Sequence, residues 1–238
     1  GKGGVRKSTT AINLAMALQR TGVDVGLLDA DVYGPSMAMM FGLDGKPSIT
    51  PEKKIIPMDG HGVKVVSMGF LSDPEKPVLW RGPMVHGLLQ QFLKDVEWGA
   101  LDYQVIDLPP GTGDAQLSLS QAISISGAVI VTTPQEISLL DARKGLLMFR
   151  QMKVPVLGIV ENMSYFLCPH CNERTETFRH GGGKKASETL GVPFLGAVPI
   201  DPAVVVGGDT GPPIVPANPE SPAAKAFLQL AGKAAPHT

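Results

Sequence analysis

The 238-residue chain contains few cysteines, few aromatic residues and almost no net charge. Two cysteines are too few for a disulfide framework. The net charge of −1 offers no bulk attraction to nucleic acid or to an anionic membrane surface. No apolar run approaches the length of a membrane span. These absences argue against a disulfide-rich, a nucleic-acid-binding or a membrane-spanning protein.

Glycine and proline are frequent instead, with 28 and 21 residues, as in folds with many strand–helix turns. With 43% hydrophobic residues, the chain suits one large domain over 1–238 with a substantial core. We expect helices at 84–96 and 137–151 and short apolar strands at 25–29, 63–67, 103–107, 128–132, 156–160 and 194–198. This alternation predicts an α/β fold, a doubly wound and mostly parallel sheet with helices on both faces.

The first ten residues, GKGGVRKSTT, form a phosphate-binding pattern. Gly1, Lys7 and Ser8 fit G-x-x-x-x-G-K-[ST], in which glycines let backbone N–H groups approach the phosphates. Lys7 would neutralise the phosphates, and Ser8 would ligate Mg²⁺. A helix from about Ser8 onward would point its positive end at the same anion. A capped glycine-rich turn is the alternative, but Lys-Ser-Thr-Thr follows in register, so a nucleotide is the predicted ligand.

Arg6 occupies the position of the second glycine of that pattern. If the position requires a positive φ, a Cβ there costs on the order of 1 kcal/mol, and the long side chain crowds the phosphates. A guanidinium is, on the other hand, a good bidentate partner for phosphate. Because the loop wraps closely around its ligand, we expect the steric effect to dominate and to weaken ATP binding or hydrolysis.

Acidic residues and glycines follow two of the predicted strands. Asp107 ends one strand and is expected to bind Mg²⁺, directly or through water, unless it is an ordinary strand-end residue. Asp31 could orient an attacking water, although capping of a turn explains it nearly as well. Gly111 and Gly113 give the loop after Asp107 a mobility suited to sensing the γ-phosphate. Because ligands bind at the carboxyl ends of such strands, these residues should converge on the phosphate loop.

The second chemical feature is Cys168-Pro169-His170-Cys171, within a polar segment at about 164–180. Two thiolates at this spacing can bind Zn²⁺ or an iron–sulfur cluster, or form a redox pair. Two unrelated surface thiols are the plain alternative. A four-thiolate site needs four cysteines, so with two it requires one pair from each of two chains. A single-chain zinc site completed by His170 or His180 ranks lower.

The chain begins inside the phosphate-binding pattern and without a methionine. A P-loop normally follows a central strand, so we expect the first central strand to be missing and the chain to be truncated at its N-terminus. Any targeting segment would be missing as well, which leaves the compartment open.

Longer motifs occur along nearly the whole sequence: GKGGV-KSTT at 1–10, LLDADVYGPS at 27–36, VLWRGPM at 78–84, DLPPGTGD at 107–114, TTPQ at 132–135, ENMSYF at 161–166 and CPHC at 168–171. Together they resemble the Mrp/ApbC family of P-loop iron–sulfur carrier proteins, including its mitochondrial NUBPL type. The wider class, with the MinD/ParA ATPases and the nitrogenase iron protein, has a deviant P-loop with an early lysine, which Lys2 matches.

The resemblance implies a role for each matched residue. Lys2, which would reach the partner subunit's nucleotide in a face-to-face homodimer, Lys7 and Asp31 would be catalytic. The nucleotide and Mg²⁺ would be held by Gly1, Gly3, Gly4, Lys7, Ser8, Thr9, Asp107 and Asn162, with Ser8 and Asp107 at the metal and Asn162 at adenine. Cys168 and Cys171 would share a [4Fe–4S] cluster across the dimer.

The function implied is an ATP-binding carrier that delivers its cluster to apo-proteins, with slow ATP hydrolysis impaired by Arg6. Its compartment would be the bacterial cytoplasm, or the mitochondrial matrix if a targeting segment is missing. A MinD/ParA-like positioning ATPase is one alternative, but the tail at 223–233 is short and weakly charged for a membrane-binding helix. A zinc- or cluster-binding scaffold without hydrolysis is the other, made plausible by Arg6.

Overall fold

The computed structural model describes residues 4–31, 34–70, 82–111 and 114–235. The strands are β1 Val25–Asp29, β2 Met58–Gly60, β3 Val63–Ser67, β4 Tyr103–Asp107, β5 Ala128–Thr132, β6 Val156–Glu161, β7 Phe166–Leu167, β8 Arg174–Thr175 and β9 Phe194–Ala197. The helices are α1 Lys7–Gln19, α2 Met37–Phe41, α3 Gly82–Lys94, α4 Asp114–Ala122, α5 Glu136–Gln151, α6 Gly182–Leu190, α7 Pro202–Thr210, α8 Ile214–Ala217 and α9 Pro222–Ala234, with a 3₁₀ turn, η1, at Met68–Phe70.

The six strands expected from the sequence all form, with ends that differ by no more than one residue. The larger sheet has the order β2-β3-β1-β4 and is parallel except for β2, which pairs antiparallel with β3. A second, fully parallel sheet has the order β5-β6-β9. Within the described residues the six expected strands are thus divided between two hydrogen-bonded sheets where one was expected, because apolar runs mark strands but do not specify which strands pair.

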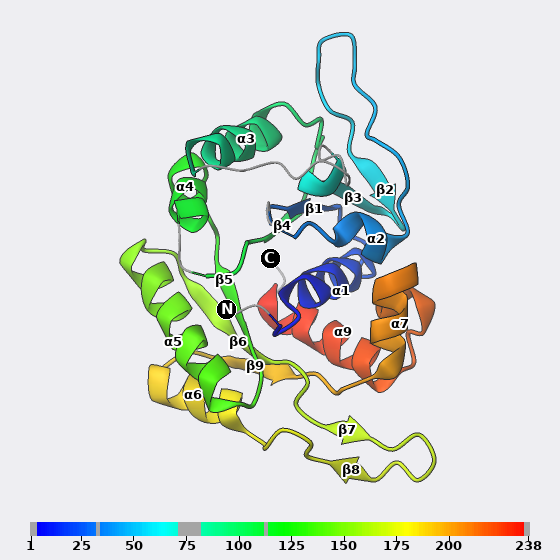
Figure 1. Cartoon of the computed structure of the whole chain (residues 1–238), viewed down its shortest axis with the longest axis vertical. Coiled ribbons are helices and arrows are strands. Elements are labelled where there is room, and N and C mark those ends of the chain that lie inside the picture. The colour runs from blue at the N-terminus through cyan, green and yellow to red at the C-terminus, as the bar shows by residue number, and fades with distance from the viewer. Residues whose placement is uncertain (1–3, 32–33, 71–81, 112–113, 236–238) are drawn as a thin grey trace.

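Helices lie on both faces of the strands, as the alternation of buried side chains requires (Figure 1). Leu27 of β1 packs with α1 and α9, whereas its neighbour Leu28 packs with Leu89 and Phe92 of α3 on the opposite face. The core around α1 and α9 also includes Val160 and Leu195 of the second sheet. These two helices therefore join the two sheets into one body.

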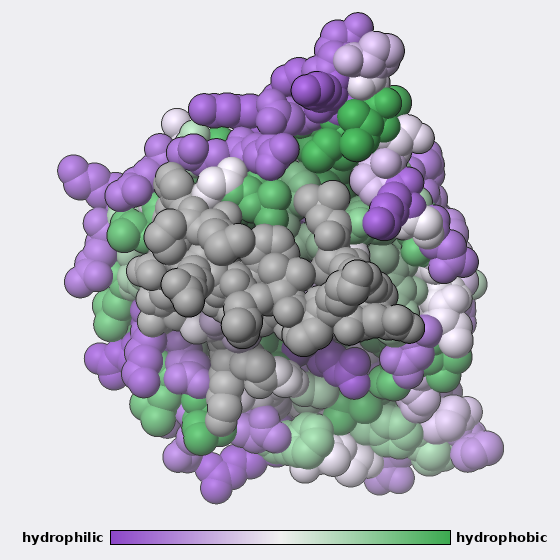
Figure 2. All heavy atoms as spheres, turned by 45° about the horizontal axis from the view of Figure 1, so that its top comes forward, coloured by the Kyte–Doolittle hydropathy of each residue, from purple (hydrophilic) through white to green (hydrophobic). Residues whose placement is uncertain are grey.

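Two segments project from the body of the domain. The segment between α2 and β2 projects from the domain, and the projecting part at the top of the space-filling view is largely hydrophilic (Figure 2). A second projection is the antiparallel hairpin of β7 and β8, which the sequence did not predict. None of the helices in the described part of the chain is long and apolar enough to cross a membrane.

Candidate functional site

The phosphate loop enters α1 through a left-handed residue. Arg6 is the N-cap of α1, with φ 60° and ψ 48°, and its side chain is exposed. Gly4 also has a positive φ, of 91°. The positive φ considered for Arg6 in the sequence analysis is therefore present. Glycine adopts this conformation without steric cost, whereas other residues do not. Gly1, Lys2 and Gly3 lie outside the described residues.

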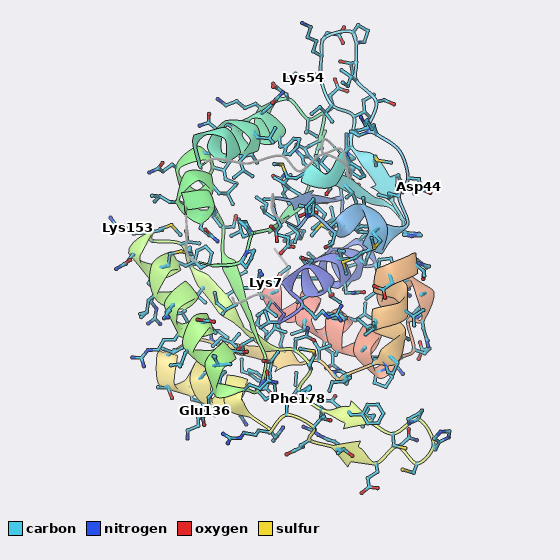
Figure 3. All side chains as sticks on the ribbon, in the orientation of Figure 1. Lys7, Asp44, Lys54, Glu136, Lys153 and Phe178 are labelled. Carbon is cyan, nitrogen blue, oxygen red and sulfur yellow. The ribbon has the colours of Figure 1, made fainter. Side chains whose placement is uncertain are left out.

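The first turn of α1 contacts the end of β4. The Ser8 hydroxyl donates to Oδ2 of Asp107 at 2.5 Å, and Lys7 lies close enough to act electrostatically on the same carboxyl. Lys7 is found at the centre of the molecule, where α1 begins (Figure 3). The predicted magnesium pair, Ser8 and Asp107, is thus brought together. The next predicted residue, Thr9, is buried, and its backbone carbonyl accepts from Asn13.

Burial raises the pKa of Asp107 to about 7, because a charged carboxylate is poorly solvated there. The hydrogen bond from Ser8 opposes that shift, as does the charge of Lys7, whereas Asp29 and Asp31 add to it. A divalent cation at this position would favour the ionised form and reverse the effect. The hydroxyl of Ser8 and the carboxylate of Asp107, with Lys7 nearby, are oxygen ligands that fit a hard cation such as Mg²⁺ bound together with phosphate.

A second carboxyl, Asp29, lies beside Asp107 because their strands are parallel and in register. Asp29 is buried and accepts from the hydroxyl of Ser67 at 2.7 Å and from the backbone N–H groups of Asp31 and Met37. Burial raises its pKa. Asp29 thus fixes the backbone at Asp31, whose carboxylate accepts from Gly34 N–H. The sequence singled out Asp31 and treated Asp29 only as the end of a strand.

The loop after β4 is held by a residue that the sequence did not indicate. The buried Gln116 of α4 donates from Nε2 to the carbonyls of Pro109 and Gly111, both at 3.1 Å. Gly111 has a positive φ of 103°. Gly113, the other expected glycine of this loop, lies outside the described residues. In the sequence, only the polar character of Gln116, a few residues after this loop, could have indicated the contact.

Asn162 lies against the phosphate loop, although the two are far apart in the sequence. Its Nδ2 donates to the carbonyl of Val5 at 3.1 Å, and its Oδ1 accepts from Met163 N–H. The side chain is buried. Asn162 therefore ties the phosphate loop to the end of β6, and its predicted contact with adenine stays a prediction.

The residue before it, Glu161, joins β6 to the cysteine segment. Its carboxylate accepts from the Ser164 hydroxyl at 2.6 Å and from Gly183 N–H at 2.5 Å, and its exposed fraction is 1%. Ser164 begins the segment that carries the two cysteines, and Gly183 lies in the first turn of α6. Through Asn162 and Glu161, the end of β6 contacts both the phosphate loop and the base of the cysteine hairpin.

Cys168 and Cys171 form a turn between β7 and β8, and both are free thiols. Hydrogen bonds from the backbone N–H groups of Cys171 and His170, and then from the Cys171 thiol, lower the pKa of Cys168. At its base the hairpin is braced by the guanidinium of Arg174, 3.9 Å from the ring centre of Tyr165. Among the described residues, no group of three or more His, Cys, Asp or Glu side chains could hold a metal ion. His170 and His180 therefore do not complete a single-chain zinc site in this conformation.

The fold is that of an α/β P-loop NTPase of the MinD type. MinD of Pyrococcus horikoshii, solved with Mg-ADP, is 25% identical with a TM-score of 0.72, over 97% of this chain and 91% of that one. A nucleotide-binding protein of Archaeoglobus fulgidus, solved with ADP, is 42% identical with a TM-score of 0.77, over 88% of this chain and 82% of that one.

The family follows from the sequence comparisons. Residues 1–235 match the ParA family described as NUBPL iron-transfer P-loop NTPase. An iron–sulfur cluster carrier protein of Synechocystis is 57% identical over 98% of this chain and 69% of its own length. A mitochondrial iron–sulfur protein required for NADH dehydrogenase, from Arabidopsis thaliana, is 48% identical over 97% of this chain and 74% of its own length. The chain belongs to the Mrp/NUBPL family of P-loop NTPases.

Proposed function

We propose that the protein holds a [4Fe–4S] cluster between two copies of the chain and transfers it to apo-proteins. One observation carries the proposal: Cys168 and Cys171 lie together on a projecting hairpin with no third ligand among the described residues. A cubane cluster takes four thiolates, which two such pairs supply. The exposure of the turn leaves the cluster accessible to a recipient, and the names of the two relatives support this cargo.

The nucleotide in this proposal is ATP with Mg²⁺. Lys7 would neutralise the phosphates, Ser8 and Asp107 would hold the metal, and Asp31 would orient the attacking water. Lys2 would act across the dimer. ATP bound to the phosphate loop would alter the contact of Val5 with Asn162 and, through Glu161 and Ser164, the base of the hairpin. Nucleotide state and cluster affinity would then be coupled as two distinct sites.

The compartment proposed is the bacterial cytoplasm, with the mitochondrial matrix as the alternative. The bacterial and plant mitochondrial relatives support both choices, and the thiol pair needs reducing conditions in either.

Anaerobic reconstitution tests the cluster. The native protein should take up iron and sulfide in equal amounts, at one cluster per two chains, and sediment as a dimer. The double variant Cys168→Ser, Cys171→Ser should lose the cluster and its absorption spectrum. The matched variant His170→Ala, His180→Ala should keep both. A spectrum unchanged in the cysteine variant would refute cysteine ligation, and loss in the histidine variant would favour the mixed site.

A scaffold that binds a cluster or zinc without hydrolysing ATP is the second candidate. The left-handed conformation of Arg6 favours it, because strain in the phosphate loop opposes tight nucleotide binding. ATP hydrolysis that is present in the native chain and abolished by Lys7→Ala would exclude the scaffold. A chain with no hydrolysis and an intact cluster would support it.

A further inference from the structure

A groove of about 490 Å³ lies between α5 and α6, and its lining residue His180 contacts Arg174 at the base of the hairpin that carries the cysteines. Its apolar lining comes from both helices: Leu139, Leu140, Ala186 and Leu190. Its rim includes Glu136, Arg143 and Lys185 from the helices and Arg179 and His180 from the chain that returns from β8. Glu136 and Phe178 mark the start of α5 and that returning chain in Figure 3. The groove uses none of the residues assigned to the nucleotide or the cluster.

The two helices hold the groove open as a preformed surface. At one end, the guanidinium of Arg150 donates to the carbonyl of Leu190 at 2.6 Å. At the other end, Gly182 lies so close to Pro134 and Leu139 that a Cβ would come within 2.9 Å of both residues. Both ends are therefore fixed by contacts between α5 and α6, and a ligand would not have to separate the helices.

The rim carries positive charge that the chain itself does not neutralise. Arg179 is paired with Glu136 at 2.8 Å, and His180 contacts Glu176 and Arg174. Arg143 and Lys185 are exposed and have no ion pair or hydrogen bond from their side chains within the described part of the chain. Two unpaired cations thus flank an apolar floor.

Apolar side chains continue along α5 beyond the groove. Leu140 is 60% exposed, and Leu147 lies two turns further along the same helix and is also exposed. Arg143 lies between them, at spacings of three and four residues that place all three on one face. A helix laid along α5 and α6 could bury these leucines and pair its own carboxylates with Arg143 and Lys185.

We propose that this groove docks an acidic amphipathic helix of the apo-protein that receives the cluster. The proposal rests on the proposed carrier function for the identity of the partner. It is argued from charge complementarity and from position, because Arg179 and His180 of the rim end the same segment that carries Cys168 and Cys171. A partner held here lies next to the base of the cysteine hairpin.

Binding of a labelled peptide tests the groove on protein without cluster. The probe is a helical peptide of about five turns with leucines on one face and glutamates on the other. A peptide of the same composition in scrambled order controls for charge alone. Fluorescence anisotropy should show binding of the amphipathic peptide that weakens with salt, and about tenfold weaker binding of the scrambled one.

Charge reversal locates the binding. Arg143→Glu with Lys185→Glu should weaken peptide binding about tenfold or more, whereas Lys46→Glu with Lys153→Glu, the same change at exposed sites that do not line the groove, should leave it unchanged. Equal binding by both double variants would overturn the proposal. So would equal binding of the scrambled peptide, or rim-dependent binding to phosphatidylglycerol vesicles without binding of the peptide.

The outcome is separable from that of the carrier function. Iron and sulfide uptake is measured on the same variants, and the rim double variant should load as the native protein does. Failure of peptide binding would remove the groove proposal and leave cluster loading intact. Failure of cluster loading in the native protein would remove the carrier function, whatever the peptide does.

Discussion

Replacing Arg6 by glycine should both stabilise the protein and tighten its binding of ATP. Arg6 is held at φ 60° and ψ 48° at the start of α1, where an L side chain crowds its own backbone. Its side chain is exposed and gives α1 no capping hydrogen bond, so removing it loses no such contact. The change therefore acts mainly on the backbone of the phosphate loop.

The expected stabilisation is about 1 kcal/mol, the lower end of the cost of a left-handed non-glycine residue. The extra freedom that glycine gives the unfolded chain offsets part of the relief. For a domain of this size, the midpoint of thermal unfolding should rise by about 2–4 °C. If the strain also opposes closure of the loop on phosphate, ATP affinity should rise roughly five- to tenfold, since about 1.4 kcal/mol corresponds to a factor of ten.

Two controls separate strain from other effects. Lys53→Gly removes a side chain from an exposed residue with a similar φ of 64°, in the projecting segment before β2. It should raise thermal stability by a similar amount and leave ATP affinity unchanged. Arg6→Ala keeps the Cβ but removes the guanidinium, so it should retain the strain and shorten the side chain.

Isothermal titration with ATP and Mg²⁺ and thermal unfolding by circular dichroism provide the measurements. Equal ATP affinities of the native protein and Arg6→Gly would refute the argument that sterics dominate at this position. Weaker binding by both Arg6→Gly and Arg6→Ala would show that the guanidinium binds phosphate, and that its favourable contact outweighs the strain.

Three further predictions concern buried groups of the site. Because the pKa of Asp107 is about 7 in the folded chain and its ordinary value is 3.8, the stability that its protonated form contributes is present below pH 4 and is lost as the pH rises to about 7. This loss is about 4 kcal/mol at most, and Asp107→Asn should remove that pH dependence in urea titrations without metal. Mg²⁺ affinity should rise up to tenfold per pH unit below 7 and level off above it, in titrations that also detect proton release; a flat profile would show that Asp107 is already ionised. Gly183→Ala should destabilise the fold by about 1–3 kcal/mol, since a Cβ would come within 2.9 Å of Glu161. The control Gly232→Ala in α9, with open space around it, should stabilise the fold by about 0.5–1 kcal/mol. Equal effects of the two changes in chemical denaturation would contradict the close packing of Gly183 against Glu161.

Features that depend on neighbouring residues could be read from the sequence. Apolar runs marked six of the seven strands of the two main sheets, all but the edge strand β2, because burial on both faces demands them. Asp107 was assigned to the phosphate loop because strand ends meet at one edge, and its hydrogen bond with Ser8 confirms that they lie together. The short strands β7 and β8 were not predicted, because a strand of two residues is too short to show the alternation of apolar and polar side chains.

By itself, the sequence determined the family, the phosphate loop with its one irregular residue, and the thiol count on which the proposed two-chain site rests. Only the tertiary structure decided which distant groups meet: Asn162 with Val5, Glu161 with Gly183, and the two helices that form the cationic groove. It also decided that Arg6 takes a left-handed conformation. The reason is physical: motif spacing and hydrophobic periodicity are local properties, whereas pairing of strands and contacts between distant side chains depend on the packing of the whole chain.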